Sequence, residues 1–89
     1  MAWTIDYTET ATKRLRKLDK PTALRILDFL DARIAGQENP RVTGKALTGP
    51  RLGTYWRYRV GDYRILCDNQ DDALRILVIE IGNRREVYR

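Results

Sequence analysis

The chain has 89 residues, enough for one small domain spanning residues 1–89. Hydrophobic residues make up 43% and charged residues 33%, which fits a folded domain and argues against a disordered chain. No apolar stretch approaches the roughly 20 residues of a membrane span, and no secretory signal is visible. Cys67 is the single cysteine, so an internal disulfide is excluded, and we expect a cytoplasmic protein without a membrane partner.

The absence of histidine excludes a histidine general base, a histidine-activated nucleophile and a zinc site with histidine ligands. No pattern of metal ligands and no phosphate-binding glycine loop is present, so we expect no cofactor. Lys and Arg outnumber Asp and Glu by 17 to 12, and 13 of the 17 are arginine. Because the guanidinium fork matches phosphate, this balance favours a polyanionic partner such as nucleic acid. A solvated basic surface explains the same balance equally well.

The first part of the chain predicts a strand and two helices. Residues 2–7 alternate between apolar and smaller or polar side chains, which is typical of a short strand. Thr8 is the expected N-cap of a first helix, with its apolar face made of Ala11, Leu15 and Leu18. Asp19 or Lys20 caps a second helix that Gly36 ends, and the two form a hairpin. The apolar stripe of the second helix consists of Ala23, Ile26, Leu27, Leu30 and Ile34.

Residues 37–52 lack a hydrophobic period and contain two prolines and two glycines, so we expect a long loop anchored by Val42 and Leu47. Three strands follow, at residues 53–60, 63–68 and 74–81, with turns at 61–62 and 69–72. The last strand is the most hydrophobic and should be central. The order β-α-α-β-β-β predicts an α+β fold, a helical hairpin packed on a largely antiparallel four-stranded sheet, with the place of the first strand left open.

Strand alternation predicts a cluster of arginines on one face of this sheet. Arg57 and Arg59 share a face with Tyr55, whereas the helices should cover the face of Trp56, Tyr58 and Val60. A hairpin would bring Arg64 close to Arg57 or Arg59. Because like charges opposite each other destabilise a strand pair, we favour a functional role for this cluster. The alternative is that Asp62, Asp68 or Glu80 neutralises each arginine.

Beyond the last strand, Arg84 and Tyr88 belong to a basic tail that lies near the same edge of the sheet. Neighbouring arginines would stabilise the phenolate and lower the pKa of Tyr88. Cys67 sits among apolar neighbours and should be an inert part of the core. The loop residues Arg41, Lys45 and Arg51 are equally consistent with phosphate contacts and with a solvated loop.

Three stretches resemble the RelE/ParE superfamily of toxins from type II toxin–antitoxin systems: KALTG at 45–49, YWRYRVGDYRI at 55–65 and IGNRREVY at 81–88. The similarity covers essentially the whole chain and implies the RelE-like microbial RNase architecture. The turn Asp62-Tyr63-Arg64 and the terminal tail are fairly specific for the RelE branch, whose members cut mRNA in the ribosomal A site. The resemblance thus implies a metal-independent endoribonuclease that inhibits translation.

The resemblance also implies a role for each matching residue. Arg57 and Arg59 stand where the family commonly has phosphate-holding lysines that take part in proton transfer. Arg64 contacts the scissile phosphate, Arg84 adds positive charge, and Tyr88 stacks on the substrate or acts as the base. Further RNA contacts are expected from Lys45, Arg51 and Arg85.

The implied partners are a cognate RelB-like antitoxin, the ribosome and mRNA, with operator DNA bound only by the toxin–antitoxin complex. Two alternatives stay open. One is the ParE branch, which inhibits DNA gyrase and generally lacks the full basic set and the final tyrosine. The other is an RNA- or protein-binding module without catalysis, which would use the sheet arginines but leave Tyr88 without a role.

Overall fold

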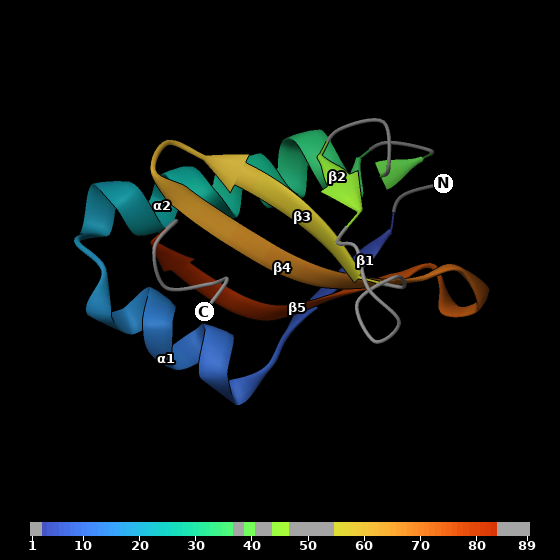
Figure 1. Ribbon diagram of the computed structural model, residues 1–89, viewed down its shortest axis with the longest axis horizontal. Helices are drawn as coiled ribbons and strands as arrows, with labels where there is room; N and C mark the ends of the chain where they lie inside the picture. Colours follow the sequence, from blue (N-terminus) through green and yellow to red (C-terminus); the bar gives the residue numbers. More distant parts are fainter. Residues whose placement is uncertain (1–2, 37–38, 41–43, 47–54, 84–89) are drawn as a thin grey trace.

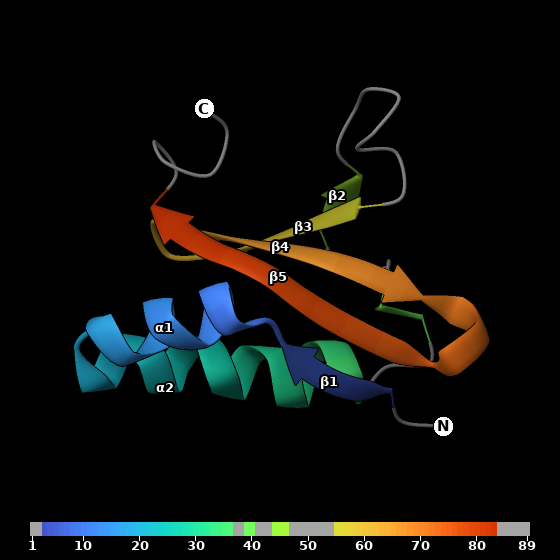
Figure 2. The same ribbon diagram turned by 90° about the horizontal axis from the view of Figure 1, so that it is seen from below.

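The computed structural model describes residues 3–36, 39–40, 44–46 and 55–83. In chain order, the elements are β1 (Thr4–Tyr7), α1 (Glu9–Lys17), α2 (Lys20–Asp28), η1 (Phe29–Ala35), β2 (Lys45–Ala46), β3 (Tyr55–Val60), β4 (Tyr63–Gln70), η3 (Asp71–Ala73) and β5 (Arg75–Asn83). The strands form one sheet in the order β1-β5-β4-β3-β2. Figures 1 and 2 show both helices on the same side of this sheet. The predicted α+β layering is confirmed.

The sheet is mixed, because β1 pairs parallel with β5 while the other three pairings are antiparallel. The open question about the first strand is thereby answered: β1 is an edge strand beside β5. The prediction that residues 74–81 form the central strand was wrong in detail, since β5 lies between β1 and β4 and β4 takes the middle. Both strands have neighbours on each side, and this explains why both are rich in apolar residues.

Two turn and loop predictions also need correction. The short strand β2 lies inside the segment 37–52, which was expected to be irregular throughout, and it pairs with β3. The strand β4 extends to Gln70, so the following turn is the 3-10 helix η3 and not the tetrapeptide 69–72. Leu74 closes this turn with a φ of 48°, a left-handed conformation that turn residues rather than leucine usually adopt. Val42 and Leu47 lie outside the described residues.

Both helices begin at side-chain caps. The Oγ1 of Thr8 accepts a hydrogen bond from the Ala11 amide and donates one to the Ile79 carbonyl, at 3.1 and 2.6 Å. Thr8 therefore fixes the start of α1 against β5. Of the two candidates for the second cap, Asp19 is the one used, and its carboxylate accepts from both the hydroxyl and the amide of Thr22. The bond from the hydroxyl, and then the one from the amide, lowers the pKa of Asp19.

The second helix changes its winding along its length. It continues from α2 into the π-helix η1 and ends at Gly36, which the sequence predicted. Gly36 has a φ of −76°, so the left-handed cap expected of glycine is not formed. Leu30 and Ile34 are four positions apart on one face of this segment, and both are fully buried.

The core lies between the helices and one face of the sheet. It includes Ala11, Ile26 and Leu30 from the helices and Tyr58, Ile65 and Val78 from the strands. Tyr58 and Val60 are buried and Trp56 packs against the cluster, so the predicted facing of this strand is confirmed. No helix in the described part of the chain is long and apolar enough to cross a bilayer.

Candidate functional site

Four basic side chains share the face of the sheet opposite the helices. Arg57 and Arg59 alternate with the buried Tyr58 along β3 and therefore point away from the core. Arg64 on β4 lies directly opposite Arg59, and Lys45 on β2 lies directly opposite Arg57. The predicted closeness of Arg64 to the β3 arginines is confirmed, with Arg59 as its direct neighbour.

These four side chains line one pocket of about 310 Å³, together with Phe29, Arg33 and Gly44. We call it the cationic pocket. Five of its seven described lining residues are cationic, and none of these seven is a carboxylate. Like charges at this spacing disfavour the folded state unless an anion compensates them. The pocket therefore suits a ligand with several negative charges, and its arginines suit phosphate oxygens in particular.

The three acids that the sequence offered as neutralising partners lie elsewhere. Asp68 is opposite Tyr55, towards the other end of β4, and accepts a hydrogen bond from Gln70 at 3.1 Å. Asp62 is exposed in the turn between β3 and β4. Glu80 lies on β5 opposite Leu66 and lines a different groove. None of the three lines the cationic pocket.

Arg64 differs from its neighbours in burial. It lies on the expected face, but only 9% of it is exposed, so the expectation of an open position was wrong. Arg64 lies on β4, the middle strand, opposite Arg59 on one side and Gly82 on the other. Arg59, on the neighbouring strand, is exposed. A change at Arg64 therefore affects packing as well as charge.

Sequence reasoning missed Arg33, which reaches the cationic pocket from the helical layer. Its guanidinium carbon lies 5.9 Å from the ring centre of Phe29, within range of a cation–π contact. Phe29 in turn packs edge-on against Tyr58, with ring centres 6.2 Å apart. The spacing of four residues between Phe29 and Arg33 was the available signal, but only the tertiary structure shows which strand the pair approaches.

Two further residues hold the wall of the pocket in place. Tyr58 donates a hydrogen bond to the Pro40 carbonyl at 2.8 Å and accepts one from Asn69 at 3.2 Å. Gly44 has a φ of +87°, and a Cβ built there would lie 2.3 Å from the Arg57 carbonyl. Only glycine fits this approach, which brings the next residue, Lys45, into register with Arg57.

The remaining predicted site residues are Arg51, Arg84, Arg85 and Tyr88, and all four lie outside the described residues. Their roles stay predictions. Of the residues predicted for the site, the structure brings together Lys45, Arg57, Arg59 and Arg64.

Two buried proton-bearing groups are unsuited to chemistry near neutral pH. Burial raises the pKa of the Cys67 thiol, which is fully buried, as expected of an inert core residue. Burial, and then the charge of Asp31, raises the pKa of Tyr7 to about 12. Within the described residues, no three Cys, Asp or Glu side chains gather as potential metal ligands.

The sequence of the whole chain is similar to known proteins. Residues 5–88 match the family described as the ParE toxin of type II toxin–antitoxin systems, parDE. The chain is 27% identical over 89 residues to Toxin RelG of Mycobacterium tuberculosis, covering 100% of this chain and 99% of the relative.

The fold is shared with solved toxin structures. The toxin–antitoxin complex RelBE2 of Mycobacterium tuberculosis aligns with a TM-score of 0.83 at 23% identity, covering 97% of this chain and 95% of that one. A mutant of the E. coli toxin RelE in the free state aligns with a TM-score of 0.79 at 24% identity, covering 98% and 88%. The predicted RelE-like architecture is confirmed.

Proposed function

Since the chain belongs to the RelE/ParE superfamily of type II toxins, we propose that it is a ribosome-dependent endoribonuclease that cuts mRNA in the A site. The observation that carries this proposal is the cationic pocket. Its five basic side chains, with no carboxylate among the described lining residues, suit an RNA phosphate and the additional charge of its transition state.

The reaction needs neither metal nor water. The ribose 2′-oxygen loses its proton and attacks the adjacent phosphorus in line. The bond from phosphorus to the 5′-oxygen then breaks, and this oxygen takes up a proton. The products are a 2′,3′-cyclic phosphate and a free 5′-hydroxyl. The enzyme must accept one proton, supply another and stabilise the charge on the phosphorane.

The described residues fit the charge-stabilising part of this reaction best. Arg64 and Arg59 are cross-strand neighbours and can hold two oxygens of one phosphate. Arginine stays protonated up to about pH 12, so it is a poor proton carrier. Lys45 is the one lysine among the described lining residues, and an ammonium gives up a proton more readily than a guanidinium, so we assign it the role of general acid.

Tyr88 completes the proposal as the general base. Changing Tyr88 to Phe keeps the ring and removes the hydroxyl, and we expect the cleavage rate to fall by roughly 10²–10⁴. If Tyr88 only stacks on a nucleobase, Tyr88→Phe will cut at nearly the wild-type rate while Tyr88→Ala will not. Lys45→Arg keeps the positive charge but removes the proposed general acid. We therefore expect the cleavage rate at saturating substrate to fall, while substrate binding is retained.

A toxin of this class implies an antitoxin, and we propose an acidic, RelB-like partner that covers the cationic pocket. Among the neighbours, the archaeal RelE from Pyrococcus horikoshii was solved with its RelB, at a TM-score of 0.76 and 24% identity, covering 98% of this chain and all of that one. Complementary charge would speed this association.

The second candidate function is inhibition of DNA gyrase, because the matching family is described by its ParE members. Expression without an antitoxin distinguishes the two. An mRNA interferase stops growth and leaves cuts inside translated reading frames while DNA supercoiling stays normal. Growth arrest with intact mRNA and altered supercoiling would replace our proposal with the gyrase function.

A further inference from the structure

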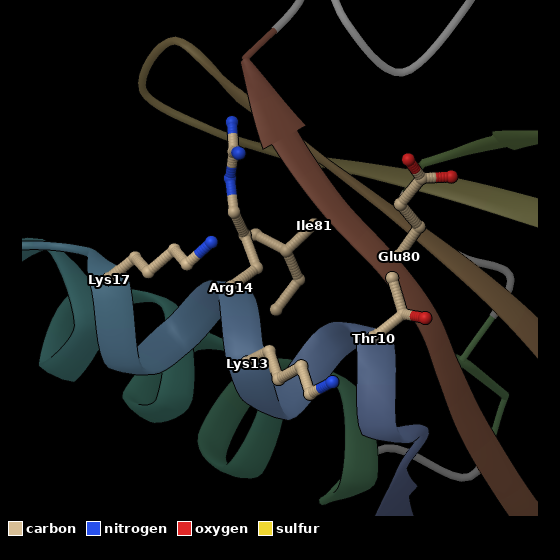
Figure 3. A pocket seen from close by; sticks show the side chains of 6 residues that line it. All are labelled: Thr10, Lys13, Arg14, Lys17, Glu80 and Ile81. Atoms are coloured by element: carbon tan, nitrogen blue, oxygen red, sulfur yellow. The ribbon is translucent and has the colours of Figure 1, made fainter.

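A second groove runs between α1 and the C-terminal half of β5, with a volume of about 260 Å³. The strand β1 pairs only with Arg75–Val78 of β5, so along this edge the rest of β5 lies beside α1, while its other edge pairs with β4. Thr10, Lys13, Arg14 and Lys17 line the groove from the helix, and Glu80 and Ile81 line it from the strand (Figure 3). We call it the α1 groove.

Three cations of one helix point into this groove. Residues 13 and 14 fall on the same side of α1 as residue 17 because they are four and three positions from it. Figure 3 shows Lys17 reaching towards Arg14, whose guanidinium rises beside β5. Lys13 contacts Glu9 at 3.3 Å, but both side chains are largely exposed, so this pair is weak and easily exchanged for a phosphate.

The groove adjoins the cationic pocket across one pair of strands. Arg64, which lines the pocket, lies directly opposite Gly82 on β5, two residues from Glu80. The strands β3 and β5 are two strand spacings apart, about 10 Å. A nucleic-acid backbone held at Arg59 and Arg64 would therefore lie within about 10 Å of β5, whose Glu80 and Ile81 line the α1 groove.

We propose that the α1 groove binds a second phosphate of the RNA backbone, adjacent to the one held in the cationic pocket. This inference rests on the proposed nuclease function and adds the path of the substrate. With three cations and one carboxylate, the described lining carries a net charge of +2. Glu80 stands at the end of the opening away from Lys17, so repulsion confines the phosphate to the side of Arg14 and Lys17 (Figure 3).

The helix dipole gives a competing reason for basic residues here, since cations in the last turn stabilise any helix. That reason applies equally to Arg16, which is in the same turn but is exposed and does not line the groove. Arg16 is therefore a matched control: its loss changes the helix dipole interaction and the net charge, but removes nothing from the groove.

The test measures the affinity of the full-length toxin for a single-stranded oligoribonucleotide that is 2′-O-methylated throughout and so cannot be cut. Wild type, Lys13→Gln/Lys17→Gln and the control Arg16→Gln/Lys20→Gln are titrated between 50 and 200 mM salt. Arg14 is left intact because it is half-buried. Each lost phosphate contact lowers the slope of log affinity against log salt by about 0.7.

We expect the groove variant to lose affinity on the order of tenfold at low salt, with a slope reduced by about 0.7, the value for one lost phosphate. The control should keep the wild-type slope. Equal slopes for the two double variants, or an unchanged slope in the groove variant, would overturn the inference. A second outcome would also overturn the inference. If binding of a poly-glutamate peptide depends on Lys13 and Lys17 while binding of the oligoribonucleotide does not, the groove is a site for an acidic protein segment.

Cleavage on programmed ribosomes separates this inference from the proposed function. If the toxin binds the oligoribonucleotide with the predicted slopes but cuts no mRNA, the nuclease proposal fails and the groove remains a phosphate site. If the toxin cuts mRNA and the slope is insensitive to Lys13 and Lys17, only the groove assignment fails.

Discussion

Charged side chains lie near both ends of β4, but only at one end is an arginine paired with a described carboxylate. At one end, the Nε of Arg75 donates to Asp6 at 2.6 Å and its Nη1 contacts Gln70 at 3.4 Å. At the other end, Arg64 and Arg59 meet across the strands and share the cationic pocket with three more basic residues. Arg75 thus has a carboxylate partner within the sheet, whereas the five cations of the cationic pocket have no carboxylate among the described lining residues.

This contrast suggests two roles for charged side chains: pairing within the fold at one end and ligand binding at the other. The pair of Arg75 and Asp6 joins β5 to the edge strand β1 and explains both residues without a ligand. In the cationic pocket, five cations line one surface with no carboxylate among the described lining residues, and such clustering lowers stability. Our proposal of an RNA phosphate as the ligand accounts for this clustering. The following predictions test whether the two ends differ in this way.

Among single changes within the cationic pocket, the largest effect should come from Arg64. Changing it to Ala removes a charge-assisted contact to the phosphorane, and single-turnover cleavage should slow by about 10²–10³. Because Arg64 is nearly buried, Ala should also lower the melting temperature. Arg64→Lys keeps the charge and most of the stem, so it should restore stability but only part of the rate. If a stably folded Arg64→Ala protein cleaves at the wild-type rate, the assignment of this end of the sheet to catalysis is contradicted.

A smaller effect is expected from the titration of Tyr7, which lies beside Asp6 on β1. Its pKa is raised to about 12, so the folded state holds this proton more tightly than the unfolded state, in which the pKa is about 10. The stabilisation is complete below pH 10 and disappears as the pH rises towards 12. Since the ring is only half-buried, we expect a loss of about 1–2 kcal/mol.

Chemical denaturation of wild type and Tyr7→Phe between pH 8 and 12 measures this loss. The phenylalanine variant should show a shallower decline in unfolding free energy, with the difference confined to pH 10–12. Parallel curves for the two proteins would contradict the assigned burial effect.

Arg33 should contribute modestly to cleavage because it is exposed at the rim of the pocket. We expect Arg33→Gln to slow cleavage about twofold to fivefold, mainly through weaker substrate binding. Arg25→Gln on the same helical segment removes the same charge outside the pocket and is the matched control. An equal effect of both variants would mean that net charge, and not position, is being measured.

The smallest effect is predicted for the compensated end. The Arg75 and Asp6 side chains are 40% and 48% exposed, so solvent screens their attraction. The double variant Asp6→Asn/Arg75→Gln should lose less than about 1 kcal/mol of unfolding free energy and cleave at the wild-type rate. A substantial loss of cleavage would show that this end also belongs to the site.

The sequence was most informative where local rules decide the outcome. Alternation along residues 55–60 correctly separated the buried Tyr58 from Arg57 and Arg59, and the glycine turn at Gly61, with a φ of +58°, joined the expected strands. The cap at Thr8 was predicted from residue type alone, but its bond to the Ile79 carbonyl was not, because that partner is 71 positions away.

The features that could not be predicted from the sequence depend on contacts between residues far apart in the chain. The parallel pairing of β1 with β5 depends on where the helical hairpin returns the chain, and no local pattern encodes it. Arg64 is nearly buried although strand alternation predicts an open position, and Arg33 lines the pocket beside Phe29, which packs against Tyr58. The two-residue β2 is too short for any periodicity, yet it places Lys45 beside Arg57.

The most direct test of the central claim compares the two ends of the sheet in one assay. Single-turnover cleavage on programmed ribosomes would be measured for Arg57→Gln/Arg59→Gln and for Asp6→Asn/Arg75→Gln, with thermal melts of both. We predict that the first variant loses at least about 10² in rate while staying folded, and that the second cuts like wild type. Equal rates for the two folded variants would contradict the assignment of the cationic pocket as the site of RNA cleavage.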